Sequence, residues 1–142
     1  MTVHALPVVD AGGNVNACVN DPSFNLTAGT PMGGTWSGTG ITNATNGTFN
    51  PGTAGTGSHT ITYTYTDGNN CENSDFLFVN VLGLPNVDAQ GDITYCDVDY
   101  NISLNTPSPS GGIWSGIGVV NANPGAFNID SAGGLGVYPL IY

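Results

Sequence analysis

Residues able to do chemistry are few in this chain of 142 residues. It has two histidines, His4 and His59, and three cysteines, but no lysine or arginine. None of them falls in a Gly-x-Ser-x-Gly, His-Glu-x-x-His or Cys–His metal spacing. The absence of lysine also excludes Schiff-base chemistry, a P-loop and a Lys–Asn isopeptide crosslink. We therefore predict that the protein is not an enzyme, and we expect His59 at the surface, on the threonine-rich side of a strand.

Oxygen ligands for calcium are the best candidates for a metal site. The stretch Asp97–Asn101 (DVDYN) begins like a calcium loop, yet Ile102 stands where an EF-hand needs glycine and Ser108 where it needs a bidentate glutamate. Two carboxylates near the repeat boundaries could instead clamp calcium between modules, and solvated carboxylates are the ordinary alternative. The candidate ligands are Asp97, Asp99, Asn101, Asp10 and Asp88. We predict no other cofactor.

The chain contains an internal repeat. The stretch GGTWSGTGITNATNGTFN at residues 33–50 returns as GGIWSGIGVVNANPGAFN at residues 111–128, an offset of 78 positions. The match runs without a gap from Leu6 to Gly55. One inserted residue then aligns GSHTITY at 57–63 with GVYPLIY at 136–142. A fixed period of this kind is the signature of repeated structural units.

The repeat predicts two domains, residues 1–83 and residues 84–142. The second has no counterpart of residues 64–83, so we expect it to be truncated before its last strands. The 142 residues then represent either a segment of a longer array or a subunit whose open edge is filled by a strand from another chain.

Short alternating segments predict an all-β fold. In HTITYTYTD, residues 59–67, Ile61, Tyr63 and Tyr65 alternate with threonines, as in a half-buried strand. DFLFVNVL, residues 75–82, is its expected antiparallel partner. SFNLTA and GTWSG indicate further short strands, NATNG and NPGTAG indicate turns, and no stretch of ten residues has helical periodicity. Such spacing predicts tandem immunoglobulin-like β-sandwiches, the second one incomplete.

The repeated aromatic residues have two interpretations. Trp36 and Trp114, with Phe49 and Phe127, are expected to form the core signature of the two sandwiches, and the surrounding glycines allow turns and close backbone approach. The alternative is an exposed Trp-Gly platform that stacks on sugar rings.

The cysteines also have two interpretations. Cys18 and Cys71 could join the two sheets of the first sandwich, and the partner of Cys96 would then lie outside the chain. Such a bridge would indicate an oxidising, extracellular location. The alternative is three unpaired thiols in a reducing compartment.

Charge and hydropathy restrict the partners. Ten acidic residues and no basic ones give a formal net charge of −10, so nucleic acids and anionic membrane surfaces are not expected to bind. No apolar run has the length of a membrane span, and the first residues lack the pattern of a secretion signal. Solubility carried by threonine and asparagine is typical of secreted β-proteins.

The chain contains the paired elements GG.WSG.G and TYTYTD…C and the early stretch LPVVDAG. With these elements it resembles the immunoglobulin-like repeats, related to polycystic-kidney-disease-type domains, of very large Bacteroidetes cell-surface proteins. Those proteins are similar to gliding-motility adhesins, which are exported by type IX secretion. The resemblance implies a β-sandwich stalk module at the bacterial surface that contributes to adhesion, gliding or biofilm, and it brings no catalytic residues. The triplet Asp130–Ala132 also resembles a Bacteroidetes O-glycosylation signal, which would place a glycan on Ser131.

Two functional classes follow. The first is a non-catalytic structural module of a long extracellular adhesin or filament, whose partners are neighbouring repeats or like subunits. The second is a module that binds surface glycans or proteins directly. Because a core signature that occurs twice suits a spacer better than a dedicated binding site, we favour the first.

Overall fold

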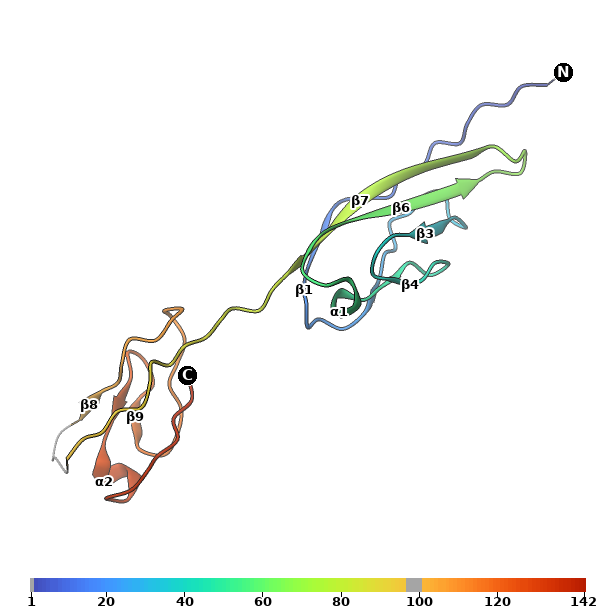
Figure 1. Ribbon diagram of the computed structural model, residues 1–142. Coiled ribbons are helices and arrows are strands. Elements are labelled where there is room, and N and C mark those ends of the chain that lie inside the picture. The colour runs from blue at the N-terminus through green and yellow to red at the C-terminus, as the bar shows by residue number, and fades with distance from the viewer. Residues whose placement is uncertain (1, 97–100) are drawn as a thin grey trace. The chain divides into compact units, whose positions relative to one another are not determined.

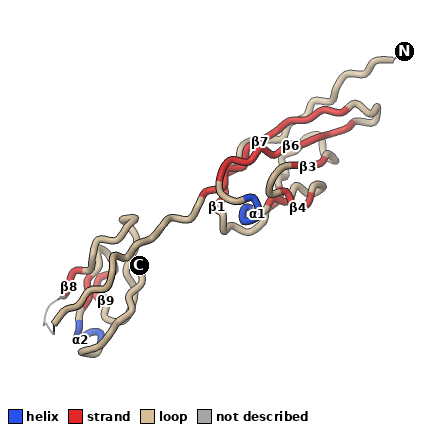
Figure 2. The backbone as a smooth tube through the Cα atoms, in the orientation of Figure 1, coloured by secondary structure: helices blue, strands red, loops and turns tan. Residues whose placement is uncertain are grey.

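The computed structural model describes residues 2–96 and 101–142. The chain divides into two compact units, unit 1 (Met1–Leu84) and unit 2 (Pro85–Tyr142). This division lies one residue beyond the domain boundary expected from the repeat. Figure 1 labels the elements and Figure 2 shows that strands and loops make up nearly all of the chain. The described residues form an all-β architecture with two four-residue helices.

The larger sheet of unit 1 has the order β1-β7-β6-β3. Its elements are β1 (Val15–Cys18), β3 (Thr35–Ser37), β6 (Gly57–Thr66) and β7 (Glu72–Leu82). The long strands β6 and β7 form an antiparallel hairpin over their whole length, which confirms the two longest strands expected from the sequence (Figure 1). The short strand β1 runs parallel to the end of β7, with Val15 opposite Val79 and Cys18 opposite Leu82.

A smaller antiparallel sheet has the order β2-β5-β4. Its strands are β2 (Phe24–Asn25), β4 (Ile41–Asn43) and β5 (Thr48–Phe49). The two sheets share one hydrophobic core, because side chains from both belong to a single buried cluster. The buried members of this cluster are Ala11, Leu26, Trp36, Phe49, Ile61, Tyr63, Leu77, Val79 and Val81.

Alternation along the hairpin decides which side chains enter the core. In β7, Leu77, Val79 and Val81 are buried while Phe76 and Phe78 are exposed. Successive side chains of a strand point to opposite faces, so every second residue of β7 packs under the sheet.

The segment NPGTAG, expected as a turn, contains the helix α1 (Pro51–Ala54). The side chain of Asn50 accepts a hydrogen bond from the Thr53 amide at 3.0 Å, and Pro51 occupies the first turn. This sequence starts a helix because the asparagine side chain accepts one of the free first amides, while proline has no N–H to leave unpaired and its fixed φ suits the first turn. The expected turn is therefore a single helical turn.

Unit 2 repeats the smaller sheet and the helix. Its strands β8 (Ile102–Ser103), β9 (Val119–Asn121) and β10 (Ala126–Phe127) have the order β8-β10-β9, and α2 (Ile129–Ala132) follows. The counterpart of the β3–β6 pairing is a single antiparallel bridge between Ser115 and Ile141. Among the described residues of unit 2, no strand takes the place of β1 or β7.

Candidate functional site

The two tryptophans lie in matching arrangements that we call the Trp–Tyr corners. In unit 1, the rings of Trp36 and Tyr63 have centroids 4.7 Å apart. The Tyr63 hydroxyl accepts a hydrogen bond from the Gly34 amide at 2.8 Å and donates one to the Pro31 carbonyl at 2.6 Å. One tyrosine thus joins β6 to the loop before β3.

The corner of unit 2 has the same connections. The ring centroids of Trp114 and Tyr142 are 5.3 Å apart. The Tyr142 hydroxyl accepts from the Gly112 amide at 2.7 Å and donates to the Pro109 carbonyl at 2.8 Å. The sequence analysis named the tryptophans but missed the tyrosines, although the same alignment pairs Tyr63 with Tyr142.

Glycine is required where the tyrosine ring meets the backbone. A Cβ atom placed on Gly34 would lie 2.5 Å from Cζ of Tyr63, and one on Gly112 would lie 2.5 Å from Cζ of Tyr142. Both distances are far shorter than a carbon–carbon contact. The repeated glycines therefore leave room for the ring and for the hydrogen bond to its hydroxyl.

Neither tryptophan forms an exposed platform for sugars. Trp36 is 4% exposed and Trp114 is 6% exposed, and Phe49 and Phe127 are also buried. The interpretation of an exposed Trp-Gly surface is therefore wrong, because the tyrosine ring and the core cover the indole. The four aromatic residues of the core signature serve packing in both units.

The cysteines do not form the bridge expected from the sequence. Cys18 and Cys71 are free, and so is the exposed Cys96. Cys18 lies opposite Leu82 at one end of β7, whereas Cys71 directly precedes Glu72 at the other end. Ten residue steps of a strand separate these ends by about 33 Å, and a disulfide needs Cα atoms within about 7 Å. The topology therefore rules out a bridge from Cys18 to Cys71 inside unit 1.

The candidate calcium ligands do not come together among the described residues. Asp97 and Asp99 lie outside them, and the side chain of Asn101 accepts a hydrogen bond from Asn128 at 3.2 Å. Asp10 and Asp88 each accept from the backbone amide two residues further on, at 2.7 and 2.8 Å. Within residues 2–96 and 101–142, no group of three His, Cys, Asp or Glu side chains is placed to hold a metal.

His59 and Ser131 have local structural contacts. His59 lies on the inward side of β6, half-buried, with Nε2 2.9 Å from the Gly55 carbonyl and its ring beside Phe49. It was expected on the threonine-rich side, but the strand alternation places it with Ile61. The Ser131 amide donates to Asn128 at the start of α2, and its side chain is exposed. Glycosylation of Ser131 stays a prediction.

One carboxylate has a shifted acidity. The amides of Cys71 and Asn69 donate to Asp67 at 2.9 and 2.8 Å in the turn between β6 and β7. These backbone hydrogen bonds, that from Cys71 first, lower the pKa of the Asp67 carboxyl. Asp67 is half-buried, and the two amides of the turn occupy its carboxylate, so it organises the turn.

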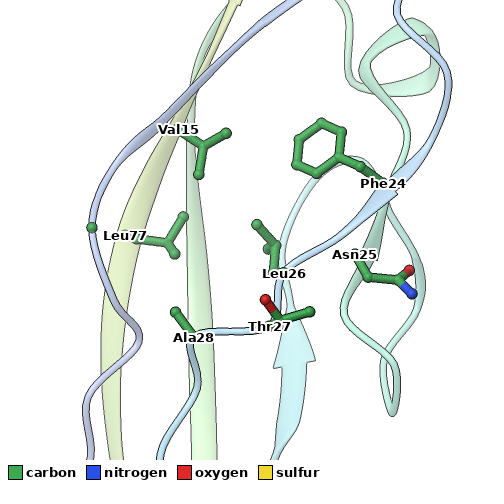
Figure 3. A pocket seen from close by; sticks show the side chains of 8 residues that line it. Val15, Phe24, Asn25, Leu26, Thr27, Ala28 and Leu77 are labelled. Carbon is green, nitrogen blue, oxygen red and sulfur yellow. The ribbon is translucent and has the colours of Figure 1, made fainter.

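An apolar depression lies in each unit. In unit 1, a cavity of about 270 Å³ lies where β1, β2 and β7 approach, lined by side chains such as Val15, Leu26 and Leu77 (Figure 3). Its lining contains no titratable group.

A larger groove of about 840 Å³ lies in unit 2. It is bordered by Ile93–Tyr95 and Val137–Leu140, and Ile102, Trp114 and Phe127 contribute to its lining. We call this cavity the unit 2 groove. Its lining also contains the carboxylates of Asp88 and Asp92.

Comparison of the chain with models of protein families, with curated proteins and with solved structures gives no match. Among the described residues, none of the helices has the length and apolar character needed to cross a membrane.

Proposed function

We propose that the chain is a non-catalytic structural module of a long extracellular bacterial surface protein, an adhesin or filament, built from tandem immunoglobulin-like β-sandwiches. The observation that carries this proposal is the Trp–Tyr corner, which occurs twice with the same hydrogen bonds. A framework reproduced in this detail serves the fold of each unit, as expected of a repeat whose task is to extend a chain.

The topology of unit 1 supports the immunoglobulin-like part. Two sheets enclose one core, the first strand runs parallel to the last, and a buried tryptophan lies on the strand next to β6. These features are shared with immunoglobulin-type sandwiches. The free thiols remove the disulfide as an argument for an extracellular location, which therefore rests on composition and on the resemblance to surface repeats.

The location is tested by surface proteolysis of intact cells that produce the protein natively. We expect peptides of this chain in the released material, and in a parent polypeptide much larger than the 14.4 kDa of these residues. A cytosolic marker protein is the control for lysis. Recovery of the peptides only from the cytosol of lysed cells would contradict the proposal.

A second function, direct glycan binding, is favoured by one observation. Phe76 and Phe78 are 54% and 38% exposed on the outer face of β7, with ring centroids 5.6 Å apart. Their partners across the hairpin are Thr62 and Thr60, which supply hydroxyl groups beside the rings. Exposed aromatic faces next to hydroxyl donors suit sugar rings.

The glycan test uses this pair rather than the buried tryptophans. On a glycan array, binding that is lost in Phe76→Ser and Phe78→Ser but kept in Leu82→Ser would support it. Leu82 is the matched control because it is similarly exposed on the same side of β7. Absence of binding by the unmodified chain would leave the structural module as the function of unit 1.

A further inference from the structure

An asparagine followed by glycine lies in the loop between β4 and β5 of unit 1. Asn46 is the one asparagine of the sequence that precedes a glycine, Gly47. A glycine amide can approach the preceding side chain closely, because glycine has no Cβ to hinder it. An asparagine in this pair can therefore cyclise with the main chain when neither reacting group is held elsewhere.

Both reacting groups are free in the folded chain. Asn46 is exposed, and its own backbone amide donates to the side chain of Asn43 at 3.0 Å. Across the described residues, no hydrogen bond from the protein engages the Asn46 side chain or the Gly47 amide. Asn43 differs, because its side-chain oxygen accepts the amides of Thr45 and Asn46 at 3.1 and 3.0 Å. The loop thus holds the side chain of one asparagine and leaves that of the other available.

The equivalent loop of unit 2 lacks this pair. By the repeat offset, Pro124 stands at the position of Asn46 and Gly125 at that of Gly47. In both loops the glycine carbonyl accepts a leucine amide, at 2.9 Å in unit 1 and 3.1 Å in unit 2. Pro124 has no side-chain amide, and its nitrogen carries no hydrogen with which to displace the amide of Asn123. The repeat therefore supplies a matched loop that cannot cyclise.

We propose that Asn46 is a site of spontaneous deamidation. The Gly47 amide nitrogen attacks Cγ of Asn46, the bond from Cγ to Nδ2 breaks, and ammonia leaves with the amide hydrogen of Gly47. The product is a succinimide ring. One water molecule then opens the ring at either carbonyl carbon, which gives aspartate or isoaspartate. Water is the one co-reactant, and no oxidation or reduction takes place.

Isoaspartate formed from Asn46 would act on the Trp–Tyr corner of unit 1. Its main chain passes through the former side-chain carbonyl carbon, so it is one carbon atom longer directly before Gly47. Gly47 lies against the indole, since a Cβ atom placed on it would be 2.7 Å from Cδ1 of Trp36. The new carboxylate also adds a negative charge to a chain with a formal net charge of −10 and no lysine or arginine. We therefore expect the hydrogen bond from the Leu26 amide to the Gly47 carbonyl to loosen, while unit 2 stays unchanged.

The test follows the full 142-residue chain during incubation in mildly alkaline buffer. A brief digestion after aromatic residues releases residues 37–49, and tandem mass spectrometry assigns each exchange of NH2 for OH to Asn43 or Asn46. Asn46 should convert at least about tenfold faster than Asn43, because it alone precedes an unhindered amide. Asn46→Gln should abolish the conversion, since glutamine would have to form a larger ring. Pro124→Asn should introduce the reaction into unit 2. None of these results depends on where the protein is located.

Hydrogen exchange measures the effect on the corner. Ion-exchange chromatography separates the converted chain by its added charge. In that chain the Leu26 amide should exchange at least about tenfold faster than in the unconverted chain, because its acceptor is displaced. The Leu104 amide, its counterpart in unit 2, should exchange at the same rate in both. Conversion of Asn46 no faster than that of Asn43, no conversion of the new side chain in Pro124→Asn, or unchanged exchange at Leu26 would each overturn the proposal.

Discussion

Unit 1 and unit 2 share the Trp–Tyr corner but differ in how the core beside it is covered. Around the corner of unit 1, Ile61 and Val79 are completely buried. In unit 2, Leu140 at the position of Ile61 is half-buried beside the unit 2 groove. The corner therefore forms without β7, whereas full burial of the core needs it. The Trp–Tyr corner therefore depends on residues near the tryptophan and tyrosine in each repeat. Full burial of the core depends on β7, which is distant in sequence.

Replacing the two tryptophans by alanine should give the largest difference between the units in lost free energy of unfolding. In Trp36→Ala, unit 1 should lose about 3–5 kcal/mol of its free energy of unfolding, because a buried indole is replaced by a cavity. Trp114→Ala should cost unit 2 less, since its core is already open at the groove. Urea unfolding followed by hydrogen exchange in each unit measures both. Equal losses would contradict the comparison.

Ile61 and Leu140 occupy the same core position in the two units. Only Ile61 is covered by β7, so alanine variants of the two residues show what this cover contributes to stability. Ile61→Ala should cost unit 1 about 2–5 kcal/mol, the usual range for a buried aliphatic side chain. Leu140→Ala should cost unit 2 only about 1 kcal/mol, because a half-exposed side chain loses less buried area. Urea unfolding followed by hydrogen exchange in each unit measures the two losses. A loss in Leu140→Ala as large as that in Ile61→Ala would show that contact with β7 does not decide how much this position contributes.

The elements that the sequence predicted are those with local signals. Alternation in residues 59–67 and 75–82 predicted β6, β7 and their antiparallel pairing, and the repeated Trp36 and Trp114 marked buried positions. The parallel pairing of β1 with β7 had no such signal, because its register depends on residues more than sixty positions apart. For the same reason, the sequence did not reveal that Cys18 lies beside one end of β7 while Cys71 precedes its other end.

The candidate site was predictable only in part. The glycines and tryptophans of the corners stand out because they recur, but the bridging role of Tyr63 depends on where its hydroxyl arrives after folding. The sequence predicted that unit 2 lacks a counterpart of residues 64–83, but it did not predict the unit 2 groove, whose lining depends on side-chain burial. The capped turn α1 was missed because four residues are too few to show helical periodicity.

Removing the tyrosine hydroxyls should cause smaller losses of stability, and it compares only the hydrogen bonds of the two corners. Tyr63→Phe leaves the buried Gly34 amide and the Pro31 carbonyl without this partner, and we expect a loss of about 1–3 kcal/mol. Tyr142→Phe should cost about 0.5 kcal/mol, since water can replace the hydroxyl at an exposed corner. Thermal unfolding measures the stability, and the ring packing is the same in both variants. A larger loss for Tyr142→Phe would mean that unit 2 depends more on its corner than unit 1 does.

The smallest effect concerns the turn that joins β6 to β7, an element of unit 1 alone among the described residues. Backbone hydrogen bonds from Cys71 and Asn69 lower the pKa of Asp67 in the folded chain. A carboxyl with a lowered folded pKa stabilises the fold above its unfolded pKa of about 3.9, and that contribution is lost as the pH falls through the folded pKa. Asp67→Ala should therefore lower the melting temperature of unit 1 slightly at pH 7, with little further effect at pH 2. Asp67→Asn is the control, because its side-chain oxygen still accepts both amides but does not titrate. A stability difference between Asp67→Ala and the unmodified chain that is the same at both pH values would show that the charge of Asp67 does not hold the turn.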